Sequence, residues 1–158
     1  AICQVANLNS PGQLVVSGQI AALDLLEARA KDAGAKRAIR LNVAGAFHSE
    51  VMRPASEKLE AALADIEFQP ATCPVWQNAT AEASTDATVL KANLVAQLCA
   101  PVLWQESFAK MAASAPETTF LEPAPGRVLS ALARKIAREA KVITLHEAAA
   151  VANILETI

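Results

Sequence analysis

Strand-like stretches alternate with helical stretches along most of this 158-residue chain. In its second part, "CPVWQNA", "TTFLE" and "KVITL" are typical of strands, and the apolar residues around them recur at helical spacing. The expected helices cover about 90–98, 105–115, 128–136 and 147–158. Thr85 or Asp86 is expected to cap the first of these helices. Strands that alternate with helices of about ten to fifteen residues indicate a parallel sheet covered by helices, so the sequence predicts an α/β fold.

The beginning of the chain follows a different order. Two short apolar runs flank "NSPG" at 9–12, and Pro and Gly between β-forming residues predict a hairpin turn. From Ile20 the apolar residues recur at helical spacing, and Gly34 provides the left-handed residue that ends a helix. "RAIRLNV", residues 37–43, alternates apolar and polar residues as a half-buried strand does. The predicted order at the start of the chain is therefore β-β-α-β.

The pattern changes near Gly45, and this change predicts a boundary between a unit at 1–43 and a unit at 44–158. The second unit opens with an apolar stripe at helical spacing, from Met52 to Ile66. Pro54 limits how regular the first turn of this helix can be.

Composition argues against two classes of partner. Fourteen Lys and Arg residues against sixteen Asp and Glu residues give a net charge of −2, so the chain has no strong field to attract nucleic acid. Charges interrupt the apolar stretches before they reach the length that spans a bilayer, and no basic segment followed by an apolar one opens the chain. We therefore expect a soluble cytoplasmic protein that binds neither nucleic acid nor a membrane.

Three cysteines, Cys3, Cys73 and Cys99, are odd in number, far apart and without C-x-x-C spacing. This spacing argues against both a disulfide framework and a zinc site, and we expect three buried thiols. A metal site formed by His48 and His146 with cysteines is the weaker alternative.

His48 lies in "GAFHSEVMRPASEKL", directly after the expected strand and directly before the expected helix. α/β proteins display functional side chains at such positions. The positive end of a helix disfavours imidazolium and so favours the neutral ring that a general base needs. The alternative is a hydrogen-bonded structural histidine. The residues alone supply no activated nucleophile, because the chain has no G-x-S-x-G motif and no cysteine beside an activating group.

Four stretches resemble the C-terminal half of malonyl-CoA:acyl carrier protein transacylases, in the order and approximate spacing of that family. They are "NLNSPGQLVVSG", "AGAKRAIRLNVAGAFHSEVMRPA", "QLCAPVLWQES" and "LEPAPGRVLSAL". The resemblance implies that 1–43 form the last four elements of a ferredoxin-like subdomain. It implies that 44–158 form part of an α/β-hydrolase-like parallel sheet covered by helices. Ala124 stands where the family has glycine, which puts the geometry of that loop in doubt.

The resemblance also assigns roles to five residues. His48 corresponds to the catalytic base, and the main-chain carbonyl of Gln97 to the group that steadies it. Asn7 and Asn9 correspond to residues that line the cleft near the reacting group, although asparagine also closes turns of its own backbone. Phe47, in "AFH", corresponds to the residue that accompanies malonyl selection; the alternative is a core aromatic at a strand end.

The implied activity is transfer of malonyl from coenzyme A to the phosphopantetheine thiol of acyl carrier protein through an acyl-serine intermediate. Malonyl-CoA and acyl carrier protein are the implied partners, coenzyme A thioester is a substrate, and no metal or other cofactor is implied. The nucleophilic serine, the oxyanion-hole amides and the malonyl-binding arginine belong to the family's N-terminal half. The chain begins inside a strand-like run, so we expect a piece of a longer protein that is inactive alone and has an uncovered apolar sheet edge. The alternatives are an acyltransferase domain of a polyketide or fatty-acid synthase, and a non-catalytic remnant that binds carrier protein.

Overall fold

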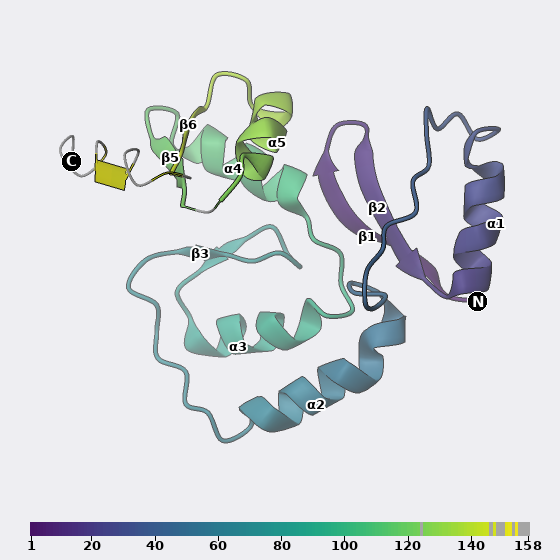
Figure 1. Cartoon of the computed structure of the whole chain (residues 1–158). Helices are drawn as coiled ribbons and strands as arrows, with labels where there is room; N and C mark the ends of the chain where they lie inside the picture. The colour runs from purple at the N-terminus through teal and green to yellow at the C-terminus, as the bar shows by residue number, and fades with distance from the viewer. Residues whose placement is uncertain (124, 146, 148–150, 153, 155–158) are drawn as a thin grey trace.

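The computed structural model describes residues 1–123, 125–145, 147, 151–152 and 154. Figure 1 shows three groups of elements: a hairpin beside helix α1, an antiparallel pair of helices α2 and α3, and a group that contains α4, β5, α5 and β6. The strands of the described residues form three separate pairs, β1 with β2, β3 with β4, and β5 with β6.

The hairpin and its helix confirm the prediction for the first part of the chain. β1 (Cys3–Ser10) and β2 (Gln13–Gly18) pair antiparallel, and Gly12 adopts a φ of +75° in the turn between them. α1 (Ile20–Ala30) follows, and Gly34 has a φ of +90°, the left-handed conformation that glycine adopts without steric cost. Local turn and cap residues therefore fix these elements.

The strand predicted at 37–43 is wrong. This segment has no strand hydrogen bonds, and its apolar residues are exposed; Ile39, for example, is 64% exposed. Its attachment is instead electrostatic, because the guanidinium of Arg40 binds the carboxylates of Asp24 and Glu27 on α1. A strand forms only where a partner strand supplies hydrogen bonds, and the described structure offers this segment none.

The two helices of the second group run antiparallel. α2 (Arg53–Leu63) begins after the 3₁₀ turn η1 (Glu50–Met52), because Pro54 lies in its first turn. α3 (Ala87–Ala96) begins at Asp86, whose carboxylate accepts from the amides of the second and third helical residues at 2.8 and 2.9 Å, as one of the two predicted caps.

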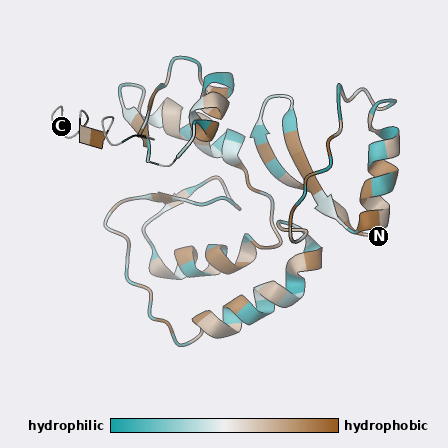
Figure 2. Ribbon diagram, in the orientation of Figure 1, coloured by the Kyte–Doolittle hydropathy of each residue, from teal (hydrophilic) through white to brown (hydrophobic). Residues whose placement is uncertain are grey.

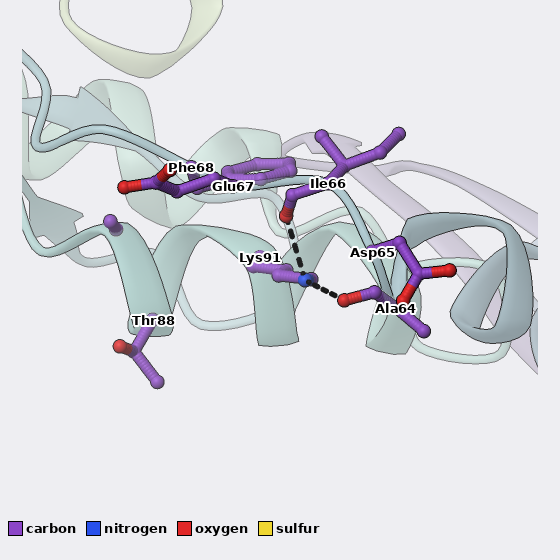
Figure 3. Close-up of a pocket in the computed structure, with 8 residues that line it drawn as sticks. Ala64, Asp65, Ile66, Glu67, Phe68, Thr88 and Lys91 are labelled. Atoms are coloured by element: carbon purple, nitrogen blue, oxygen red, sulfur yellow. Dashed lines mark hydrogen bonds between the residues drawn. The ribbon is translucent and has the colours of Figure 1, made fainter.

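Two side chains join α2 to α3. The hydroxyl of Ser56 donates to the main-chain oxygen of Val95 at 3.2 Å. At the other end, Lys91 Nζ donates to the carbonyls of Ala64 and Ile66, which follow the last turn of α2, at 3.2 and 2.9 Å (Figure 3). The relative position of the two helices is therefore set at both ends.

The last group has the predicted α/β character. β5 (Thr119–Glu122) and β6 (Lys141–Thr144) are parallel, and α4 (Trp104–Ser114) and α5 (Val128–Ile136) pack beside them. Glu122 is 6% exposed, and its carboxylate accepts from the first-turn amides Leu129 N and Ser130 N at 2.8 and 3.1 Å. The parallel sheet of the described residues is thus one strand pair, and the helix predicted at 147–158 lies largely outside them.

The connection between α2 and α3 contains a strand pair that is only half predicted. β3 (Val75–Trp76) lies within the expected strand "CPVWQNA", and it pairs antiparallel with β4 (Ala83–Ser84), which the sequence did not indicate. None of the helices within the described ranges has the length and apolar character needed to cross a membrane.

Few large side chains are fully buried. The aromatic centre is Phe108, whose ring lies 6.0 Å from that of Trp104 and 5.1 Å from that of Phe120. Cys99 is buried, but Cys3 and Cys73 are exposed, so the prediction of three buried thiols is wrong for two of them. Cys3 is exposed because it lines an apolar hollow of about 670 Å³ between the hairpin and α1, which no described element covers. Figure 2 shows that both α1 and the hairpin carry hydrophobic residues, and the lining of the hollow includes Leu14, Val16 and Leu25.

Candidate functional site

His48 occupies a tight turn just before η1, with a φ of +62°. This left-handed conformation is sparsely populated by residues other than glycine and costs on the order of 1 kcal/mol. Surrounding contacts must therefore hold the residue in place.

Two hydrogen bonds join His48 to the end of α3. Its main-chain N donates to Leu98 O at 3.0 Å, and its ring Nδ1 lies 2.7 Å from Gln97 O. A carbonyl oxygen only accepts, so Nδ1 carries the hydrogen of this bond. In the neutral ring, Nε2 then has the free lone pair, which is the arrangement that a general base requires.

Two further bonds support the turn around His48. The hydroxyl of Ser49, which is 0% exposed, donates to Ala46 O at 2.7 Å. The amide of Glu50 donates to the side-chain oxygen of Gln4 on β1 at 2.6 Å. The turn is therefore tied both to itself and to the hairpin.

A charged pair follows the turn. The guanidinium of Arg53 binds the carboxylate of Glu50 at 2.6 to 3.0 Å, and this bond raises the pKa of Arg53 above its ordinary value. Both side chains are largely solvated, so the pair contributes little to stability.

The segment 97–103, which follows α3, connects the surroundings of His48 to the hairpin. Val102 N donates to Ala6 O at 2.8 Å and Leu8 N donates to Val102 O at 2.9 Å, so the segment forms a parallel bridge with β1 opposite Asn7. The carbonyls that hold His48 and the backbone that holds Asn7 thus belong to one short segment.

The structure brings the five sequence-predicted site residues together to different degrees. His48 and Gln97 are in contact. Asn7 is half-buried on β1 and is linked to Gln97 through the segment 97–103, whereas Asn9 is half-buried nearer the hairpin turn. Phe47 is 48% exposed, so the alternative of a core aromatic does not hold in this structure.

The ring of Phe47 lies against Gly45. A methyl group at Gly45 would lie 3.3 Å from Phe47 Cε2, closer than most carbon contacts, and 3.7 Å from the sulfur of Met52. The glycine therefore leaves room for the aromatic ring beside the histidine.

Two helix ends with opposite polarity meet at His48. The sequence indicated the positive end of the helix that follows it. The structure adds the negative end of α3, because Gln97 is the residue that caps its C-terminus. Both helix ends therefore contribute to the electrostatic field at His48.

Four supporting residues were not found from the sequence: Gln4, Ser49, Asn78 and Leu98. Three of them act across large sequence separations, for which spacing gives no signal. Ser49 adjoins His48, but a serine after a histidine has no particular meaning without the turn.

A second hollow of about 450 Å³ lies at the far end of α2 and is lined by residues 64–68, Thr88 and Lys91, among others (Figure 3). It does not include His48, and α2 alone separates the two places by about 16 Å. The amine of Lys91 is bound to two carbonyls there and caps the end of the helix. Within the described ranges, no group of three His, Cys, Asp or Glu side chains could hold a metal ion, and His146 lies outside those ranges.

Known protein sequences of one family match almost the whole chain. A family profile described as "Acyl transferase domain" matches residues 3–155. The chain is 41% identical over 157 residues to the malonyl CoA-acyl carrier protein transacylase of Bacillus subtilis (strain 168), covering 99% of this chain and 49% of the relative. The transacylase of the same name from Staphylococcus aureus (strain COL) is 40% identical over 145 residues, covering 92% of this chain and 47% of that relative.

Solved structures of malonyltransferases superpose on this chain. An acyl carrier protein S-malonyltransferase from Vibrio cholerae O1 biovar eltor str. N16961 superposes with a TM-score of 0.91 at 35% identity, over 97% of this chain and 50% of that one. A malonyl-transacylase described in complex with a type II PKS acyl-carrier protein, PlMCAT:AntF (holo), superposes with a TM-score of 0.92 at 34% identity, over 99% of this chain and 50% of that one. The chain spans about half the length of the curated relatives that it matches.

Proposed function

The chain belongs to the acyl transferase domain family, and from this premise we propose that it is half of a malonyltransferase. The complete protein would move malonyl from coenzyme A to the phosphopantetheine thiol of acyl carrier protein. The similarity to malonyl CoA-acyl carrier protein transacylases supports the reaction, and the solved carrier-protein complex of a structural neighbour supports the acceptor. The single observation that carries the site is the 2.7 Å contact between His48 Nδ1 and Gln97 O.

In the proposed reaction, a serine supplied by the other half of the protein attacks the malonyl thioester. His48 Nε2 takes the serine proton as the new ester bond forms, and returns it to the departing coenzyme A thiolate as the carbon–sulfur bond breaks. The carrier thiol then attacks the malonyl-serine ester, with its proton passing to Nε2 and on to the serine oxygen. In this proposal, His48 Nε2 accepts and returns the proton in both half-reactions.

Gln97 has a positioning role in this proposal. Its main-chain oxygen holds the proton on Nδ1, so the lone pair of the ring is at Nε2, and it stabilises the imidazolium that forms during proton transfer. The strained conformation of His48 agrees with this role, because such strain is found where surrounding contacts fix a functional group.

Asn7, Asn9 and Phe47 have binding roles in the proposal. Asn7 and Asn9 would line the cleft near the acyl group and the pantetheine arm. Phe47 would exclude acyl groups with an additional methyl, and its exposed ring beside His48 supports a contact with substrate. A reducing, cytoplasmic location belongs to the same proposal, and the three free cysteines are consistent with it.

The other half of the protein would also complete the fold. The apolar hollow between the hairpin and α1 would then be covered, and the family's ferredoxin-like and hydrolase-like architectures would be complete. The accessible surface supports this, since it amounts to 10644 Å² whereas a folded monomer of 16.6 kDa exposes about 7,600 Å². We therefore propose that the chain alone does not turn over.

The test is a chimera in which this chain replaces the matching half of the Bacillus subtilis relative. We expect this chimera to transfer labelled malonyl from coenzyme A to acyl carrier protein, and His48→Ala to reduce the rate about 10²–10⁴-fold. His146→Ala, at the chain's other histidine, serves as the control and is expected to keep the rate. Unchanged transfer in His48→Ala would remove the proposed base.

The choice of carrier protein separates the remaining alternatives. A malonyltransferase of fatty-acid synthesis and an acyltransferase of a polyketide synthase use the same chemistry. The solved neighbour in complex with a type II PKS acyl-carrier protein supports the polyketide alternative. Assays of the chimera with both kinds of carrier distinguish them. A chimera that binds carrier protein without transferring malonyl would favour the non-catalytic binding remnant.

A further inference from the structure

Asn78 lies just after β3, yet it binds the segment that holds His48. Its side-chain Nδ2 donates to Gln97 Oε1 at 3.0 Å, and its main-chain oxygen accepts from Leu103 N at 2.9 Å. One residue therefore contacts both ends of the segment 97–103.

The first of these bonds acts at a sensitive place. Gln97 is the C-terminal cap of α3 and has helical backbone angles, and helix ends fray unless a side chain or a neighbouring segment holds them. Its peptide carbonyl and that of Leu98 are the two acceptors of His48. The two carbonyls belong to consecutive peptide groups, so a displacement of the backbone at Gln97 would disturb both acceptors, and the anchored Gln97 side chain limits that displacement.

The second bond fixes the other end of the segment. Leu103 follows Val102, which pairs with β1, so the bond from Leu103 to Asn78 holds the segment between the hairpin and the β3–β4 connection. Both ends of the segment that carries the carbonyls at 97 and 98 are therefore attached to neighbouring elements.

We propose that Asn78 is a positioning residue for His48 and acts through the side chain of Gln97. It keeps the ring hydrogen on Nδ1 and the lone pair on Nε2, and touches no substrate. This inference rests on the proposed function for its kinetic consequence, whereas its structural consequence can be measured in the chimera without any reaction.

The structural test is nitrogen-15 NMR of the His48 ring in the chimera described above, in which the ring signals that disappear in His48→Gln are those of His48. We expect one neutral form, protonated on Nδ1, and we expect Asn78→Ala to add a substantial fraction of the form protonated on Nε2. Gln69→Ala is the matched control, because Gln69 Nε2 makes an exposed bond of the same kind to Glu67 Oε1 at 2.9 Å, beyond the far end of α2. An Asn78→Ala spectrum identical to that of the unsubstituted chain would overturn the proposal.

A double substitution tests the route through Gln97. Gln97→Ala removes the amide that Asn78 binds but keeps the main-chain oxygen that His48 binds. We expect Asn78→Ala to change the ring spectrum in the unsubstituted chain and to add nothing in the Gln97→Ala background. An equal change in both backgrounds would show that Asn78 acts by another route and would overturn the proposal.

The kinetic arm uses the chimera described above. Asn78→Ala is expected to lower kcat about tenfold and to leave KM for malonyl-CoA within about twofold, because the residue orients the base and does not bind substrate. Asn78→Asp is expected to recover most of the rate, since the Gln97 amide can rotate and donate to the carboxylate. A change in KM for malonyl-CoA with kcat unchanged would overturn the proposal. Unchanged transfer in His48→Ala would overturn the proposed function, while the NMR result would still decide the role of Asn78.

Discussion

The hydroxyl of Ser49 donates a hydrogen bond to the main-chain oxygen of Ala46, at 2.7 Å and out of contact with solvent. The bond spans the turn in which His48 adopts its left-handed conformation. A buried side chain thus closes the loop from which the proposed base projects.

Ser49→Ala is expected to lower the free energy of unfolding by about 1 kcal/mol, because it removes a hydrogen bond whose donor side chain is fully buried. Urea denaturation measures this change, and the rate of malonyl transfer in the chimera should fall with it. Ser114→Ala is the matched control, because the Ser114 hydroxyl also donates to a carbonyl three residues earlier, that of Met111 at 3.0 Å, but is exposed. Equal losses for the two variants would show that burial of the Ser49 bond has no special effect.

Gly45→Ala is expected to reduce selectivity for malonyl, since the new methyl would displace the ring of Phe47. The ratio of kcat/KM for malonyl-CoA to that for methylmalonyl-CoA should fall about 3- to 10-fold, a part of the discrimination that a single methyl group usually provides. Ala44→Ser, at an exposed neighbouring position, should leave the ratio unchanged. If Gly45→Ala keeps the ratio while Phe47→Leu lowers it, the position of the ring does not depend on Gly45.

Lys91→Met is expected to lower the free energy of unfolding by about 1 kcal/mol and to leave the transfer rate unchanged. The amine binds two carbonyls after α2 and lies 5.8 Å from the centre of the Phe68 ring, so its loss removes two hydrogen bonds and a cation–π contact. Thermal denaturation measures the effect, with Lys58→Met on the exposed face of α2 as the control. A large loss of transfer rate would mean that this end of the helix pair reaches the site.

Lys110 gives a prediction for alkaline pH. Its ammonium binds Glu82 at 2.5 Å and Glu106 at 2.9 Å, and these two bonds, that to Glu82 first, raise the pKa of Lys110 above its ordinary value of 10.5. A pKa that is raised in the folded state stabilises the fold below the unfolded value, and the contribution is lost as the pH rises through the folded value. Lys110→Gln should therefore be less stable than the unsubstituted chain at about pH 8, and the difference should shrink above about pH 10.5.

Lys110→Arg keeps the charge at these pH values and should retain the stability that the lysine loses. The measurement is urea denaturation of the unsubstituted chain and of both variants, at about pH 8 and in the alkaline range. A stability difference between the unsubstituted chain and the Lys110→Gln variant that stays constant across this range would show that the two ion pairs do not contribute.

Much of the secondary structure could be predicted because its signals are local. Gly12 and Gly34 adopt left-handed backbone conformations that glycine favours. Asp86 caps α3 with its own side chain, which accepts from amides two and three residues later. The alternation at 37–43 is equally regular, but a strand also needs a partner, and pairing is decided by parts of the chain far away in sequence.

The candidate site likewise contains residues that a local sequence signal indicates and residues that only the structure reveals. His48 stands out in the sequence because of its place between a strand-like run and a helix, and Gln97 was identified by family resemblance. Gln4 and Asn78 carry no comparable signal, because their bonds join residues 46 and 19 positions apart and depend on the packed arrangement of three groups of elements. Polar residues that support a histidine from a distance are visible only in the structure.

The double attachment of β1 has a mechanical consequence. β1 pairs with β2 along one edge and with Val102 on the other, and Val102 continues the segment whose carbonyls grip His48. A displacement of β1 would therefore also displace the segment 97–103 and the two carbonyls bound to His48. The hairpin, the segment 97–103 and the turn of His48 are therefore joined by one continuous series of hydrogen bonds.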